Sequence, residues 1–113
     1  MPKIYYQIWS QKTISVSKSE FKIIQDTSEK HASDCDTSAF GSRHKRTSKA
    51  HSDLDLAFDC GSHLSFKRLQ DITEAFQEST LPYRVDIVDY MSVSDNFKTI
   101  IDAAKEKIFS GKI

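Results

Sequence analysis

Cysteine, proline and glycine are scarce in this chain of 113 residues, which has two cysteines, two prolines and three glycines. Neither Cys35 nor Cys60 lies in a CxxC pair. Two cysteines are too few for a disulfide framework or a zinc site built from cysteine. Both are therefore expected to be reduced thiols that pack as small core side chains in a cytoplasmic protein.

An excess of charge of either sign is also absent, because 16 lysines and arginines balance 16 aspartates and glutamates. Nucleic-acid-binding proteins usually carry a basic excess, so the balance gives no support for binding a long polyanion. No apolar run approaches the length of about 20 residues that a membrane helix needs. The first residues also lack the basic and apolar regions of a signal peptide. The length fits one domain, and we expect a soluble, cytoplasmic protein.

Helical and strand-type periodicities alternate along the chain, which predicts an α+β (α/β) domain with a small mixed sheet and helices packed on one side. Residues 1–16 are expected to form an N-terminal extension, and residues 17–113 the domain. The predicted strands are residues 4–9, 37–40, 53–58 and 83–90. The predicted helices run from Ser17 or Ser19 to about His31, over residues 64–78, and from Ser94 to about Phe109, with Gly111 as a stop.

Two aspartates alternate with leucines in the strand predicted at residues 53–58. Because alternate side chains of a strand share a face, Asp53 and Asp55 point the same way, and Leu54 and Leu56 point into the core. Two like charges side by side repel each other, and a divalent cation removes that penalty. Mg²⁺ prefers oxygen ligands and is commonly held by one or two carboxylates together with substrate phosphates. The alternative interpretation is the solvated polar face of an edge strand.

A third carboxylate, Asp86, interrupts the apolar run of the strand predicted at residues 83–90. If that strand neighbours the first, Asp86 lies beside Asp55 across the sheet. Phosphoryl-transfer sites need carboxylates that hold metal ions and one that activates the attacking hydroxyl. Asp89 faces the opposite way from Asp86 and is predicted to be a surface residue at the end of the strand.

A Gly-Ser turn precedes the aspartate pair, with Gly41, Ser42 and Arg43 directly after the strand predicted at residues 37–40. The glycine permits close approach of the backbone to a ligand. Exposed backbone N–H groups, the serine hydroxyl and the guanidinium suit a triphosphate. Three further basic residues follow at Lys45, Arg46 and Lys49, for which a solvated loop remains the alternative. The combined spacing is expected by chance in roughly one chain per thousand of this length.

These segments resemble the signature of the DNA polymerase beta-like nucleotidyltransferase superfamily. The closer resemblance is to its minimal nucleotidyltransferase (MNT) branch, which carries GSR, a basic loop, SDxDL, a helix and an apolar strand with VD. Here the matching residues are 41–43, 52–56 and 84–89, and the resemblance covers residues 21–108.

The resemblance implies a function as well as a fold. It implies that Ser42 holds phosphate, that Asp53 and Asp55 bind Mg²⁺, and that Asp86 completes the site and acts as base toward an acceptor. It implies ATP as substrate and transfer of AMP to an acceptor hydroxyl. Many MNT proteins are antitoxins of a HEPN-domain ribonuclease toxin, and some transfer AMP to a tyrosine of that toxin. The alternative is a non-catalytic nucleotide-binding module that inhibits a HEPN partner by contact.

Overall fold

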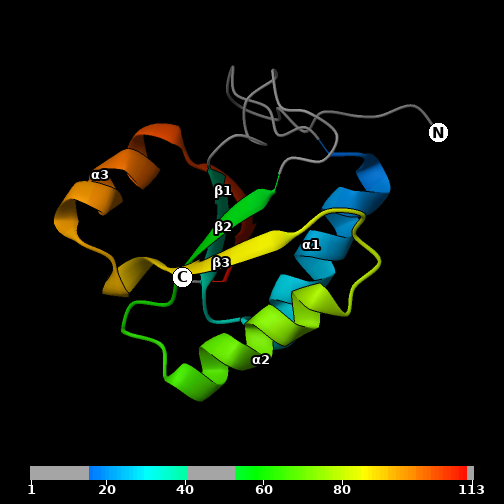
Figure 1. The fold of residues 1–113 in the computed structure, drawn as a ribbon, viewed down its shortest axis with the longest axis horizontal. Coiled ribbons are helices and arrows are strands. Elements are labelled where there is room, and N and C mark those ends of the chain that lie inside the picture. The colour runs from blue at the N-terminus through cyan, green and yellow to red at the C-terminus, as the bar shows by residue number, and fades with distance from the viewer. Residues whose placement is uncertain (1–15, 41–52, 112–113) are drawn as a thin grey trace.

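The computed structural model describes residues 16–40 and 53–111 (Figure 1). Within these ranges, no helix has the length and apolar character needed to cross a membrane. In chain order, the elements are α1 (Lys18–His31), β1 (Asp36–Phe40), β2 (Leu54–Asp59), α2 (Phe66–Gln77), β3 (Val85–Asp89), the short 3₁₀ helix η2 (Tyr90–Ser92), α3 (Asp95–Ala104) and β4 (Glu106–Ser110).

The four strands form one mixed sheet in the order β3-β2-β1-β4. β1 is antiparallel to both β2 and β4, whereas β2 and β3 are parallel. A parallel pair needs a long crossover connection, and α2 lies in that connection (Figure 1). The α+β class and the mixed sheet predicted from the sequence are therefore confirmed.

Serine side chains cap the three α-helices of the described residues. Ser17 accepts a hydrogen bond from the Glu20 N–H, and the Glu20 carboxylate accepts one from the Ser17 N–H, so α1 starts with a complete capping box. Ser65 caps α2 and Ser94 caps α3 in the same way through one bond each. Of the two starts predicted for the first helix, Ser17 is the cap and Ser19 lies within α1, and the start predicted at Ser94 is confirmed.

The alternating side chains of β2 divide the structure into two apolar clusters. Leu54, Leu56 and Phe58 belong to the main core, which α1 and α2 cover. Ala57 lies on the opposite face, in a smaller cluster with Phe40 and the α3 residue Ile101. Two helices therefore share one face of the sheet as predicted, whereas α3 covers part of the other face (Figure 1).

The last predicted helix is too long, because α3 ends at Ala104 and a fourth strand follows it. Lys105 is already extended, and Ile108, which was assigned to the helix, is buried in the main core from β4. Pairing with β1 and burial of Ile108 outweigh the helical spacing of the apolar residues. Gly111 follows the strand, where its N–H donates to the Cys35 carbonyl (3.0 Å) and to Asp36 (3.1 Å).

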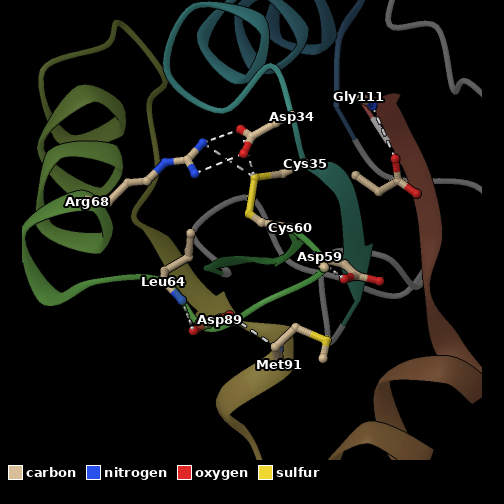
Figure 2. The surroundings of a disulfide bond; sticks show 11 residues. Asp34, Cys35, Asp59, Cys60, Leu64, Arg68, Asp89, Met91 and Gly111 are labelled. Carbon is tan, nitrogen blue, oxygen red and sulfur yellow. Dashed lines mark hydrogen bonds and ion pairs between the residues drawn. A yellow bond between two sulfur atoms is a disulfide. The ribbon is translucent and has the colours of Figure 1, made fainter. Parts of the chain in front are cut away.

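The two cysteines form a disulfide between the ends of β1 and β2 (Figure 2), so the prediction of two reduced thiols is wrong. Asp36 and Asp59 are register partners, and Cys35 and Cys60 are the next pair outward, with Cα atoms 4.0 Å apart. The antiparallel register brings the two cysteines together although they are 25 residues apart in the sequence. A search for CxxC pairs detects only cysteines that are close in sequence, so it could not predict this disulfide. The exposed ion pair between Asp34 and Arg68 lies beside this bond (Figure 2).

Candidate carboxylate site on adjacent strands

Asp55 of β2 and Asp86 of β3 lie directly opposite each other in the parallel pair. Parallel neighbours in register carry their side chains on the same face of the sheet, about 4.8 Å apart along the hydrogen-bonding direction. Leu54 and Leu56 hold β2 in this orientation because both are fully buried on the other face. The predicted meeting of Asp86 with Asp55 across the sheet is therefore found in the structure.

Asp53 lies one residue before β2 and is half-buried. The negative charge of Asp53 is close enough to Asp55 to contribute to the raised pKa of the Asp55 carboxyl. The residues described contain no group of three or more His, Cys, Asp or Glu side chains already gathered as metal ligands. The structure thus pairs Asp55 with Asp86 and leaves Asp53 at the margin of the pair.

The electrostatics of the pair single out Asp55. Its pKa is raised to about 6, first by burial, then by the negative charges of Asp86 and Asp53, and then by a side-chain hydrogen bond with Asp86. The fold holds this carboxylate where its negative charge is unfavourable. Such an arrangement is typical of functional sites.

Arg84 is a further charged residue at the site that the sequence pattern did not single out. Its Nε lies 2.9 Å from the Asp86 carboxylate, and its side chain is 75% exposed. Arg84 precedes Asp86 by two residues, the spacing that places side chains on one face of an extended segment. This two-residue spacing is the feature of the sequence from which Arg84 could have been predicted as a neighbour of Asp86.

The predicted phosphate-binding residues Gly41, Ser42 and Arg43 lie outside the described residues, as do the basic run that follows them and the strand predicted at residues 4–9. Phe40, the last described residue before Gly41, is the register partner of Asp55. The chain therefore leaves β1 next to the carboxylate pair. The roles of the three residues remain predictions.

Asp89 is buried, with 7% of its surface exposed, so the prediction of a surface residue is wrong. Its carboxylate accepts hydrogen bonds from the Leu64 N–H (2.9 Å), the Met91 N–H (3.2 Å) and the Ser92 hydroxyl. These bonds join the loop before α2 to the end of β3 (Figure 2). Asp89 is thus a structural carboxylate, distinct from the pair at the other end of the strand.

The chemistry of Asp55 and Asp86 fits a hard divalent cation. Both offer carboxylate oxygens, the ligands Mg²⁺ prefers, and two protein carboxylates are enough where substrate phosphates complete the shell. A bound cation would also remove the repulsion that raises the pKa of Asp55.

A groove between α1 and α2, lined by Lys30 and Glu74 among others, contains none of the predicted site residues.

Comparison with known proteins identifies the family to which the chain belongs. The family model described as polymerase beta, nucleotidyltransferase, matches residues 22–112. The chain therefore belongs to the polymerase beta nucleotidyltransferase family. This confirms the resemblance and the enzyme class, a nucleotidyltransferase, that were expected from the sequence.

A particular relative narrows the comparison to the MNT branch. A probable protein adenylyltransferase MntA of Haemophilus influenzae is 38% identical over 88 residues, which are 78% of this chain and 77% of the relative. The family match begins at residue 22, and the boundary predicted at residue 17 stays a prediction.

Solved structures of toxin–antitoxin complexes share the fold. One, determined with AMP-PNP, has a TM-score of 0.68 and 20% identity, and covers 78% of this chain and 71% of the matched chain. Another, an MntA–HepT complex, has a TM-score of 0.56 and 17% identity, and covers 80% of this chain and 70% of the matched chain. At these identities the likeness concerns the fold.

Proposed function

We propose that this domain transfers AMP from ATP to an acceptor hydroxyl in a Mg²⁺-dependent reaction. The acceptor oxygen bonds to the α-phosphorus, the bond from that phosphorus to the bridging oxygen breaks, and pyrophosphate leaves. The proton of the acceptor passes to a carboxylate, for which Asp86 is the candidate. The observation that carries the proposal is the register pair of Asp55 and Asp86, with a pKa of about 6 at Asp55.

Each residue has a proposed role in this reaction. Asp53, Asp55 and Asp86 hold Mg²⁺, which would neutralise phosphate charge and orient the triphosphate. Gly41, Ser42 and Arg43 bind the phosphates from the connection that leaves β1 beside Asp55.

Positioning and charge neutralisation supply most of the rate in such chemistry. Arg84 orients the Asp86 carboxylate through its Nε, which lies 2.9 Å away.

We further propose an antitoxin role, with a tyrosine hydroxyl of a HEPN-family toxin as the acceptor. The support comes from relatives. One is named a probable protein adenylyltransferase, and solved structures with this fold are toxin–antitoxin complexes. The neutral overall charge of the chain agrees with a protein acceptor better than with a long polyanion.

The experiment compares the wild-type chain with a variant carrying both Asp53→Asn and Asp55→Asn. Calorimetry measures the affinity for Mg·ATP, and mass spectrometry follows the HEPN-family protein of the same organism after incubation with ATP. We expect wild type to bind Mg·ATP and to add AMP to the toxin, and the variant to lose both activities. Asp26→Asn, at an exposed position of α1, is the matched control and should behave as wild type.

The outcomes separate the two candidate functions. Unchanged Mg·ATP affinity in the double variant would remove the metal site from the proposal. A toxin that gains no mass, yet is inhibited equally by wild type and by the double variant, would replace the enzyme with a module that inhibits by contact.

A further inference from the structure

β3 forms an edge of the sheet in the part of the chain that the structure describes, because it pairs with β2 alone. The N–H of Leu54 donates to the Arg84 carbonyl (2.9 Å), which fixes the residues whose backbone groups face β2. Alternate residues of a strand turn their backbone groups to opposite sides. The N–H and C=O groups of Val85 and Ile87 therefore point away from β2, toward the outer edge.

A groove with a volume of about 480 Å³ runs along this edge, between β3, the C-terminal half of α2 and the loop that joins them. Its apolar walls include Phe76 of α2, Leu81 of the loop, and Val85 and Ile87 of β3. Asp86 also lines it. In Figure 1, the loop after α2 leads back to the start of β3, and Leu81 of this loop is among the residues that line the groove. The groove thus borders Asp86 at the outer edge of β3, on the side of the strand away from β2.

We propose that the acceptor hydroxyl enters on an extended peptide segment that adds to the outer edge of β3 as a further strand. The proposal rests on the proposed adenylyl transfer and names how its protein acceptor is recognised. Backbone hydrogen bonds to Val85 and Ile87 supply affinity, and the groove selects side chains, as in other cases of β-strand addition.

The spacing of a sheet fixes where the hydroxyl residue lies. A strand added to β3 lies about 4.8 Å from it, as β2 does on the other side. The residue opposite Asp86 then shares its face, so that Asp55, Asp86 and the acceptor residue form a row across three neighbouring strands. The residues before and after the acceptor point to the other face, where they meet the walls formed by Phe76 and Leu81. The recognised sequence is therefore a hydroxyl residue flanked by apolar residues.

The charges of the groove favour a peptide over a nucleic acid. Among the described residues that line it, Arg84 and Asp86 are the charged ones, and they are paired with each other at 2.9 Å. A strand of nucleic acid would need several uncompensated cations along its phosphates. The groove instead offers backbone donors, backbone acceptors and apolar surface.

The first test uses a short synthetic peptide with blocked ends and one tyrosine between two valines, incubated with the chain and Mg·ATP. Each peptide of a series carries one N-methyl group at a different backbone position. We expect the rate of AMP addition to fall about tenfold when the methyl replaces an N–H that faces β3, and to be retained at the positions between. A rate that does not alternate along the peptide, or an unmethylated peptide that stays unlabelled while the full-length toxin is labelled, overturns the proposal.

The second test fills the groove from the protein side. Gln77→Trp places a large side chain on the groove wall, and Glu74→Trp, also exposed on α2 but facing the groove with α1, is the matched control. We expect Gln77→Trp to slow peptide labelling about tenfold, with Mg·ATP affinity unchanged, and the control to label as wild type. Equal labelling by both variants overturns the inference. A wild-type chain that does not bind Mg·ATP would instead overturn the proposed function.

Discussion

Two aspartates in the parallel strands β2 and β3 have opposite environments. Asp89 is buried, accepts three hydrogen bonds and joins two connections. Asp55 is half-buried, next to two other carboxylates, with a pKa raised to about 6. One carboxylate stabilises the fold, whereas the other lowers its stability.

The difference shows how stability and function are divided between the two ends of these strands. The end with Asp89 also carries the disulfide between Cys35 and Cys60 and the Asp34–Arg68 ion pair (Figure 2). The end with Asp55 carries charges that repel each other. Unfavourable arrangements of this kind persist where the rest of the fold compensates for them. The comparison can be tested at both ends.

The largest stability effect is expected from reduction of the disulfide. Opening a loop of 25 residues of sequence separation should lower the free energy of unfolding by about 3 kcal/mol. Urea denaturation with and without dithiothreitol measures the change. The double variant Cys35→Ser with Cys60→Ser should be insensitive to the reductant. A wild-type curve that does not shift would mean that this end of the strands needs no covalent support.

A smaller decrease in the free energy of unfolding is expected from Asp89→Asn. The amide nitrogen cannot accept the hydrogen bonds that one carboxylate oxygen now accepts, so the free energy of unfolding should fall by about 2 kcal/mol. Thermal and urea denaturation measure it, with the exposed Asp71→Asn as control. Equal stability of the two variants would show that Asp89 does not hold the loop before α2.

The smallest expected change in the free energy of unfolding comes from Asp55→Asn, and it is an increase. Asp55→Asn removes a charge disfavoured by burial and by its neighbours, so the metal-free protein should become more stable by about 1 kcal/mol, a figure reduced for solvent screening. Denaturation at neutral pH in the presence of EDTA measures it. A destabilised variant would place Asp55 with Asp89 as a structural carboxylate and remove the contrast between the two ends.

Much of the candidate site was predictable because its signal is local. The alternation of aspartate and leucine in residues 53–56 fixes which side chains share a face. The helix between residues 64 and 78 then allows the next strand to lie parallel beside the first, which brings Asp86 to Asp55. Arg84 lies two residues before Asp86, and the same alternation would have indicated it.

The errors concern residues whose surroundings come from distant segments. Cys35 meets Cys60 through the register of β1 with β2, which is a tertiary property. Asp89 is predicted at the surface because it is a charged residue at a strand end, facing away from Asp86. Its partners in the structure include N–H groups of the neighbouring connections, which a side-chain pattern does not record. β4 was assigned to a helix because the apolar residues from Phe97 to Ile108 keep helical spacing, and only the available edge of β1 decides against it.

The pairing of Leu54 with Val85 and of Leu56 with Ile87 has a consequence for how the site can change. Because side chains alternate, a slip of β3 by one residue against β2 would exchange its inward and outward faces and bury Asp86 among the leucines. The apolar side chains that pack into the main core thereby enforce the spacing of the polar ones. We expect variation that preserves their volume to leave the proposed chemistry intact, and an insertion of a single residue in β3 to abolish it.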